Sequence, residues 1–541
     1  MQKLLLLGDE AIAQGAIDAG ISGVYAYPGT PSTEITEYIQ SSNDARERKI
    51  RSSWSANEKT AMESAIGMSY AGKRSLICMK HVGLNVAADP FINSAITGAN
   101  GGLVVLSADD PSMHSSQNEQ DSRFYGKFAM IPIMEPSNQQ EAYDMTRYAF
   151  DLSEKFGTPV LLRITTRLAH SRAGVVRKAI TEQNKLHLPS NLKQFILLPS
   201  IARKQFNILL GKQSAFEAEA ATSGYDVLTG GNDTSIGVIA CGLSYNYLME
   251  HYPDDDLPYP VLKIGQYPIP RDLLNQLYES VDEILVLEDG YPIIEELLRG
   301  ILNKGKKIRG RMDGSIPLAG ELNPNIVAIA LNLKVEKGHD TPSIVEGRPP
   351  SLCEGCSHTD TFTALNEVML DYSPGRVFSD IGCYTLSALP PLESINTSVD
   401  MGASITMAIG ATDAGLIPSI ATIGDSTFTH SGITGLLDAV NTKSPITVII
   451  NDNSTTGMTG GQDSAAFEKV EEICRGVGVE AEHIRIIKPL RRYHDENVKV
   501  IREEINYKGV SVIIAKRECI QTLGRRMKLK ALEKREAESD N

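Results

Sequence analysis

The sequence lacks a long apolar run near its start and any excess of positive charge. Its first ten residues hold one lysine and four consecutive leucines before Gly8, a run too short for a signal peptide or a membrane span. Lys and Arg number 53 against 67 Asp and Glu, which gives a net charge of −14. Because nucleic-acid phosphates are bound by clustered positive charge, we expect no nucleic-acid partner. A cytoplasmic protein with no membrane contact is the default expectation.

Cysteine is also scarce, with seven residues in a chain that shows no secretion signal. These side chains are therefore expected to be thiols or metal ligands rather than disulfides. Cys353 and Cys356 form a CxxC motif, while Cys383 and Cys519 each follow an apolar strand, so four sulfurs could meet at one edge of a sheet. Iron–sulfur sites, zinc sites and dithiols all use this spacing, and unligated thiols are a further alternative.

A chain of 541 residues is long enough for about three domains of roughly 100 to 200 residues each. Short apolar strands alternate with helical stretches, which predicts parallel sheets covered on both faces. In the first domain the strands are expected at 3–7, 23–27, 74–79, 102–107 and 158–164, and in a smaller α/β domain at 236–240, 260–264 and 283–287. The expected divisions are 1–195, a connector 196–232, 233–345, 346–522 and a charged tail 523–541.

The stretch 418–462 carries the most informative motif. One predicted strand ends in Gly424, Asp425 and Ser426, and the next ends just before Asn453. A glycine there lets the backbone approach an anion, and the carboxylate and the amide oxygen are hard ligands for a divalent cation. One crossover helix brings two such strand ends to the same sheet edge. The pattern predicts a diphosphate and metal site, although an ordinary α/β turn can have the same Gly-Asp-Ser sequence.

Two further segments of the first domain offer site residues. Glu58 lies on the small, apolar stripe of a helix over 56–71 that also carries Ala61 and Ala65, and a buried carboxylate is costly unless it has a partner. The alternative is a carboxylate favoured by the helix dipole. Thr30 lies in a proline-flanked turn that either presents hydroxyls to a ligand or caps the next helix. The polar segment 109–123 suits a substrate loop or a solvated one. The residues after 287 could line an interface, but a plain loop is the favoured expectation.

The motifs RPPSLCEGCSH, DIGCYTL, GDSTFTHSGI and NDNSTTGMTGGQ resemble those of the large subunits of indolepyruvate ferredoxin oxidoreductases, within the 2-oxoacid:ferredoxin oxidoreductase superfamily. The likeness runs from Tyr27 to Cys519, nearly the whole chain. It implies an α/β thiamine diphosphate-binding fold with two doubly wound parallel-sheet domains. One would bind the pyrimidine and the other the diphosphate, with a smaller transketolase C-terminal-like α/β domain between them.

The resemblance also implies roles for individual residues. Glu58 would contact N1′ of the aminopyrimidine, and Thr30 would lie near the reacting centre. Gly424, Asp425 and Ser426 would meet the diphosphate, and Mg²⁺ would be held by Asp425, Asn453 and the Thr455 carbonyl. The residues that would ligate one [4Fe-4S] cluster are Cys353, Cys356, Cys383 and Cys519.

The implied reaction is oxidative decarboxylation of indolepyruvate or another arylpyruvate with coenzyme A, giving an aryl-acetyl-CoA and sending electrons through the cluster to ferredoxin. The implied assembly is a dimer of heterodimers with a smaller beta subunit. Such large subunits usually continue into a ferredoxin-like segment, which this sequence is expected to lack, so another subunit or the single cluster would pass the electrons on. A nonoxidative thiamine diphosphate-dependent decarboxylase and a noncatalytic scaffold subunit remain alternatives.

Overall fold

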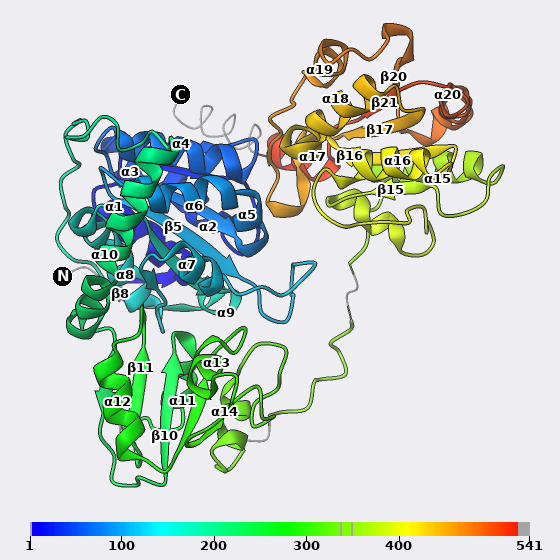
Figure 1. Cartoon of the computed structure of the whole chain (residues 1–541). Coiled ribbons are helices and arrows are strands. Elements are labelled where there is room, and N and C mark those ends of the chain that lie inside the picture. The colour runs from blue at the N-terminus through cyan, green and yellow to red at the C-terminus, as the bar shows by residue number, and fades with distance from the viewer. Residues whose placement is uncertain (1–2, 255, 336–337, 348–349, 529–541) are drawn as a thin grey trace, which may run out of the picture. The chain divides into compact units, whose positions relative to one another are not determined.

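The computed structural model describes residues 3–254, 256–335, 338–347 and 350–528 (Figure 1). The chain divides into two compact units, Met1–Asp340 and Thr341–Asn541. Part of the RPP motif that precedes Cys353, and residues 529–541 of the predicted charged tail, lie outside the described residues. Within the described part of the chain, no helix is long and apolar enough to cross a membrane.

The first unit is built on a seven-stranded sheet with the order β12-β6-β7-β5-β4-β2-β3. All of its pairings are parallel except that of the edge strand β12 with β6. The strands are β2 (Gly23–Ala26), β3 (Arg51–Trp54), β4 (Ser75–Lys80), β5 (Leu103–Asp109), β6 (Ile133–Met134), β7 (Val160–Thr165) and β12 (Gln266–Tyr267).

Alternate residues of the central strands enter two different cores. Leu76 and Cys78 of β4 pack in the core that includes helices α1 and α8, whereas Ile77 and Met79 pack in the core that includes α4 and α6. A strand buried on both faces reads as a continuous apolar run, as β4 and β5 do. The sheet is therefore covered by helices on both faces (Figure 1). The helices around it are α1 (Gly8–Asp18), α2 (Thr33–Ser41), α3 (Asn43–Glu47), α4 (Glu58–Tyr70), α5 (His81–Val86), α6 (Ala88–Thr97), α7 (Arg123–Ala129), α8 (Gln139–Phe156) and α9 (Thr166–His170).

The prediction that residues 3–7 belong to the parallel sheet is wrong. This strand, β1 (Lys3–Leu7), pairs antiparallel with β8 (Arg172–Val176) in a separate two-stranded sheet. The side chain of Leu5 is 69% exposed, which would not occur in a strand covered on both faces. An apolar run alone does not show how many of its faces are covered.

A second, five-stranded sheet of the first unit has the order β14-β13-β10-β11-β9, with β9 antiparallel to its neighbour. Its strands are β9 (Val227–Thr229), β10 (Ile236–Cys241), β11 (Val261–Ile264), β13 (Glu283–Leu287) and β14 (Lys307–Arg309), with helices α11 (Leu243–Met249), α12 (Arg271–Ser280), α13 (Ile293–Arg299) and α14 (Pro324–Ala330). The predicted connector 196–232 contains the 25-residue helix α10 (Pro199–Ser223).

The second unit contains a five-stranded, wholly parallel sheet with the order β15-β16-β17-β21-β20. Ile449 and Ile513 face one core, while Val448 and Val512 face the other. The strands are β15 (Val377–Ser379), β16 (Ser419–Gly424), β17 (Ile446–Asp452), β20 (Ile484–Ile487) and β21 (Ser511–Lys516). The main helices are α15 (Ser357–Met369), α16 (Ala403–Asp413), α18 (Ile433–Thr442), α19 (Val470–Gly476) and α20 (His494–Ile505). The ligand edge of such a sheet is where its strands end.

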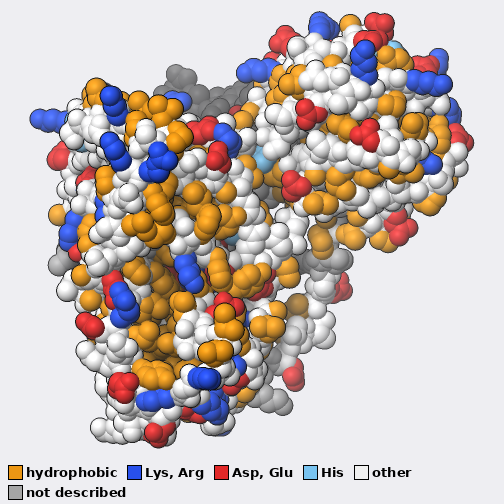
Figure 2. All heavy atoms as spheres, viewed as in Figure 1, with side chains coloured by type: hydrophobic (Ala, Val, Ile, Leu, Met, Phe, Trp, Pro, Cys, Tyr) orange, Lys and Arg blue, Asp and Glu red, His pale blue; other side chains and the backbone are white. Residues whose placement is uncertain are grey.

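Charged side chains of both signs are interspersed on the visible face of each unit, without a broad area of positive charge (Figure 2).

Candidate functional site

The Gly-Asp-Ser and Asn-Asp-Asn motifs follow two neighbouring strands. β16 and β17 pair in parallel with Gly424 opposite Asn451, so the residues after them emerge at the same edge of the sheet. Asp425 begins the short helix α17 (Asp425–Thr427) and is 2% exposed. Asn453 directly follows β17 and is also buried. The spacing thus correctly predicted adjacent strand ends.

The carboxylate of Asp425 lies in a setting that would favour a cation. Burial, together with the negative charge of Asp452, raises its pKa to about 7. Its Oδ2 atom is buried and has no hydrogen-bond partner among the described residues. Nearby, the Asn453 Oδ1 accepts a hydrogen bond from the Thr455 backbone N–H at 3.1 Å. A divalent cation suits this set, because it would use the unpartnered carboxylate oxygen and offset two neighbouring negative charges.

Gly424 and Ser426 have neighbours that the motif did not reveal. A Cβ on Gly424 would lie 2.7 Å from the Tyr384 ring, so the absent side chain makes room for that ring. The Ser426 hydroxyl lies 2.9 Å from that of Thr456. Asp380, just before the third cysteine, accepts hydrogen bonds from the Tyr384 hydroxyl and from Ser404. Neither Asp380 nor Tyr384 was predicted, since no spacing rule links them to Gly424.

The segment after Asp425 contains an irregular turn. Helix α17 continues into a π-helical turn, Phe428–Gly432, and only then into helix α18. A π turn holds one residue more than an α turn. The crossover helix between the two strand ends is therefore not one continuous α-helix.

All four predicted cysteines line one cavity of about 100 Å³ in the second unit. Cys353 and Cys356 precede α15, Cys383 follows β15, and Cys519 follows β21. The sulfurs are free thiols. Burial, together with negative charge on the other three thiols, raises the pKa of Cys383 to about 12, and burial raises the pKa of Cys356. A bound positive metal centre would favour the thiolate forms of these two side chains.

Two polar neighbours approach the sulfurs. The Nδ1 atom of His358 lies 3.5 Å from the Cys356 Sγ, and Gln521 Nε2 donates to the Cys353 Sγ at 3.7 Å. Asn453 also lines the cavity, and its backbone carbonyl accepts a hydrogen bond from the Cys519 N–H at 3.0 Å. The cysteine cavity therefore adjoins the strand-end motif.

In the first unit, Glu58 is the first residue of α4 and is 5% exposed. A Cβ on Gly83 would lie 2.6 Å from the Glu58 Oε1, so helix α5 can approach the carboxylate only with its backbone. Glu63 on the same helix is exposed and pairs with Lys59. Glu58 is therefore buried on the inner face of α4, as predicted, whereas Glu63 faces solvent.

Thr30 lies on a loop that contacts the residues at the end of strand β4 and after strand β5. Its backbone carbonyl accepts a hydrogen bond from the Ser115 hydroxyl at 3.2 Å, and Lys80 Nζ donates to the Ser115 carbonyl at 3.1 Å. Ser115 and Ser116 also donate to Asp110. Burial opposes ionisation of Asp110, but these hydrogen bonds hold its pKa below the usual value. Helix α2 begins after this turn with Ser32 as its N-cap residue, but the Ser32 side chain makes no capping hydrogen bond. Its hydroxyl donates instead to the Gly29 carbonyl at 2.9 Å.

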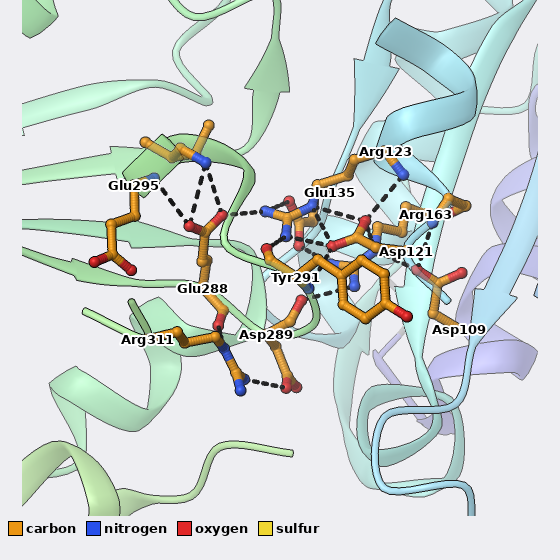
Figure 3. A network of polar contacts seen from close by, with 12 residues as sticks. Asp109, Asp121, Arg123, Glu135, Arg163, Glu288, Asp289, Tyr291, Glu295 and Arg311 are labelled. Carbon is orange, nitrogen blue, oxygen red and sulfur yellow. Dashed lines mark hydrogen bonds and ion pairs between the residues drawn. The ribbon is translucent and has the colours of Figure 1, made fainter. Parts of the chain in front are cut away.

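The expectation of a plain loop after 287 is wrong. Glu288 is buried and accepts a hydrogen bond from Arg123 at 3.1 Å, while Arg123 also donates to Asp121 and to the Tyr291 carbonyl (Figure 3). These residues come from the start of α7 and the residues just before it, and from the loop that follows β13. Their long separation along the chain hides the contact from sequence patterns.

A second arginine completes this buried ion cluster. Arg163 donates to Asp109 at 2.6 Å, to Glu135, and to the Asp289 carbonyl at 2.7 Å (Figure 3). Both arginine side chains are fully buried. Burial raises the pKa of Glu288 to about 7 and that of Asp289 to about 6, despite the nearby arginines. The segment 109–123 is thus in part a structural connection and not a solvated loop throughout.

Comparison with known proteins matches two parts of the chain. Residues 14–192 match the family described as pyruvate flavodoxin/ferredoxin oxidoreductase, thiamine diP-binding. Residues 380–515 match the thiamine pyrophosphate enzyme, C-terminal TPP binding domain. Indolepyruvate oxidoreductase subunit IorA of Archaeoglobus fulgidus is 40% identical over 96% of this chain and 86% of its own length. The chain belongs to the IorA family. The IorA subunit of Pyrococcus horikoshii is 36% identical over the same shares of the two chains.

Membership of the IorA family makes the chain a subunit of a thiamine diphosphate-dependent 2-oxoacid oxidoreductase. The two matched models cover the two regions that carry Glu58 and Asp425. A solved 2-oxoglutarate:ferredoxin oxidoreductase from Magnetococcus marinus, with 2-oxoglutarate, coenzyme A and succinyl-CoA bound, overlays with a TM-score of 0.49 at 15% identity, over 61% of this chain and 65% of that one.

Proposed function

We propose that this IorA-family subunit oxidatively decarboxylates an arylpyruvate, with indolepyruvate as the substrate that the names of its relatives suggest. In the balanced reaction, the 2-oxoacid and coenzyme A give an acyl-CoA, carbon dioxide and a proton, and two ferredoxins each take one electron. The observation that carries the oxidative assignment is the cavity lined by Cys353, Cys356, Cys383 and Cys519. A nonoxidative decarboxylase has no use for such a set.

The spacing of the sulfurs supports an iron–sulfur cluster over a single zinc ion. Tetrahedral zinc with Zn–S bonds of about 2.3 Å brings its sulfurs to within roughly 3.8 Å of one another. Among the described residues, no three of the cysteine sulfurs lie within 4.8 Å of one another. Four thiolates around one cavity at wider spacing suit a larger centre, so we assign these cysteines to one [4Fe-4S] cluster. Its position beside Asn453 would place it next to the cofactor.

The cofactor, thiamine diphosphate, supplies an electron sink for the decarboxylation. In our assignment Asp425 and Asn453, with the Thr455 carbonyl, hold Mg²⁺, while Gly424 and Ser426 approach the diphosphate. Glu58 holds or releases a proton at N1′ of the pyrimidine. The tight contact between Gly83 and the Glu58 carboxylate would keep that carboxylate in one position.

Thr30 is assigned to the neighbourhood of the reacting carbon. The Ser115 hydroxyl donates a hydrogen bond to the Thr30 carbonyl, and the Ser115 carbonyl accepts one from Lys80. These hydrogen bonds would fix the backbone of Thr30 and so the position of its hydroxyl. Burial lowers the pKa of Lys80. A carboxylate beside this buried side chain would favour its ammonium form, so Lys80 is our candidate to bind the carboxylate of an incoming 2-oxoacid.

The remaining assignments concern organisation. We divide the chain into a pyrimidine-binding domain 1–195, a connector 196–232, a transketolase C-terminal-like domain 233–345, a diphosphate-binding domain 346–522 and a charged tail. The mixed five-stranded sheet with one antiparallel edge strand supports the assignment of the middle domain. A smaller beta subunit and ferredoxin are the proposed partners, in a dimer of heterodimers.

The test is an anaerobic assay of the purified subunit, with and without a co-expressed beta subunit. Reduction of a low-potential dye would be followed with indolepyruvate, phenylpyruvate and pyruvate in turn, each with and without coenzyme A. We expect dye reduction that needs coenzyme A and is faster with the aryl substrates. Carbon dioxide release without dye reduction would refute the oxidative assignment. A preparation that binds thiamine diphosphate in titration but turns over none of the three would refute the arylpyruvate assignment.

A further inference from the structure

Three ionisable side chains meet in the first unit outside the proposed catalytic set. Asp9 is near the start of α1, Glu34 near the start of α2, and His170 is the last residue of α9. One possible ligand atom from each lies within 4.8 Å of the other two. Three separate elements therefore converge on one point, with two carboxylates and one imidazole.

Asp9 lacks the partner that a buried carboxylate needs. Its side chain is fully buried, and neither carboxylate oxygen has a hydrogen-bond partner among the described residues. Burial, together with the negative charges of Glu34 and Glu10, raises its pKa well above the ordinary value. Leaving such a group without a positive partner is costly. The nearest cationic candidate, His170, has its Nε2 3.7 Å from the Glu34 Oε1.

A single shared proton does not satisfy this site. The Glu34 Oε2 is buried and unpartnered, as are both oxygens of Asp9, which makes three such oxygens. One proton between the two carboxyl groups would join two of them and leave the third without a partner. A cation at the centre can contact a carboxylate through one or both oxygens and can bind the imidazole as well.

We propose that Asp9, Glu34 and His170 bind one divalent transition-metal cation of the Zn²⁺ type. Imidazole with carboxylates suits zinc and its neighbours, whereas Mg²⁺ and Ca²⁺ prefer an all-oxygen shell. Asp9 lies on the buried side of the proposed metal site, while the side chains of Glu34 and His170 are each 37% exposed. The exposed side gives the ion an entry path and room for water as a fourth ligand.

The site would link the starts of α1 and α2 to the end of α9. Helix α2 begins directly after the loop that carries Thr30, since its N-cap is Ser32. A bound cation would therefore hold the far side of that loop without touching substrate. Its role is positioning, and its presence is measurable without any turnover.

The test measures zinc bound per chain in the full-length protein. The protein is first stripped with a chelator and then dialysed against Zn²⁺ for elemental analysis. Cysteines stripped of their own metal centre can also take up Zn²⁺, so the informative quantity is the difference in zinc content between variants that share those cysteines. Asp9→Asn keeps the shape of the side chain and removes its charge, and we expect it to hold one zinc fewer than the wild type. The control Glu37→Gln, at an exposed position of the same helix as Glu34, should hold the full amount.

Co²⁺ replacement gives a second readout. Ligand-field absorption from nitrogen and oxygen ligands should disappear in Glu34→Gln and His170→Gln, while thiolate charge-transfer bands from the cysteines remain. These partly exposed positions keep the measurement available if Asp9→Asn does not fold. If the variants bind as much zinc as the wild type and their Co²⁺ spectra are unchanged, the proposal is wrong. Asp9 would then be buried in its protonated form without a metal.

Discussion

Arg123 is the centre of the buried ion cluster, and its replacement by methionine is the sharpest test of how that cluster works. Arg123→Met keeps much of the side-chain volume but removes the hydrogen bonds to Asp121, Glu288 and the Tyr291 carbonyl. Glu288 then remains buried without its cation, while Asp121 keeps Arg163 at 3.5 Å. Removing one partner of a buried ion pair costs about 3–5 kcal/mol, because the group left behind has lost both water and its counter-charge.

An exposed arginine of the same unit provides the matched control. Arg271 pairs with Glu217 at 2.7 Å, and its side chain is 77% exposed. Exposed pairs contribute only about 0–1 kcal/mol, so Arg271→Met should be nearly neutral. Urea unfolding followed by circular dichroism gives the comparison. Because the chain has several domains, hydrogen exchange of residues 121–129 and 288–299 should localise the loss.

The pH dependence of the penalty follows from Glu288. Its folded-state pKa, about 7, lies above the ordinary 4.5, so the folded state binds the proton more tightly than the unfolded state does. Stability from this group is therefore lost as pH rises from about 4.5 towards 7. In Arg123→Met the charge of Arg123 no longer lowers the pKa of Glu288, so the pH range over which this group loses its contribution to stability extends to higher pH. We expect the cost of Arg123→Met to be larger at pH 8 than at pH 6. A cost equal to that of Arg271→Met at both pH values would refute the ion-cluster reasoning.

Three further predictions concern single side chains. Glu58→Gln should reduce turnover at least a hundredfold with an unchanged circular dichroism spectrum, whereas Glu63→Gln, on the exposed side of the same helix, should keep its activity; an active Glu58→Gln contradicts the proton role. Cys383→Ser should lose the iron and sulfide of anaerobically purified protein, while Cys474→Ala, a buried thiol elsewhere, should keep them; zinc alone in the wild type rules out the cluster. Burial raises the pKa of Asp226 from 3.8 to about 7, so its contribution to stability should fall between about pH 4 and 7, and Asp226→Asn should make the fall in melting temperature over this range smaller; an unchanged slope contradicts the assignment.

The parts of the fold that the sequence predicts are those with a local signal. β16 and β17 are buried on both faces and read as unbroken apolar runs, so their ends, and with them Asp425 and Asn453, could be placed. The cysteines could be grouped because each follows a strand or begins a helix at the same sheet edge. Helix α4 was predicted because small residues recur on its buried face.

The features that escaped prediction depend on distant partners. Arg123 and Glu288 are 165 residues apart, and in isolation each resembles a solvated loop residue. The apolar residues of β1 look like those of a central strand, and only the pairing with β8 shows that one face stays open. Asp9 reads as an ordinary acidic residue in the first turn of a helix, until the fold brings Glu34 and His170 to it.

The π-helical turn Phe428–Gly432 gives this motif a place where its length can change by one residue. A π turn holds one residue more than an α turn, so losing one residue there would leave an uninterrupted α-helix in which the core-facing side of α18 is little rotated. A deletion inside α18 would instead rotate the residues after it by about 100°. Ala439, which now faces the core, would then turn away from it. A deletion scan should therefore tolerate a single-residue gap within Phe428–Gly432 better than one at the start of α18.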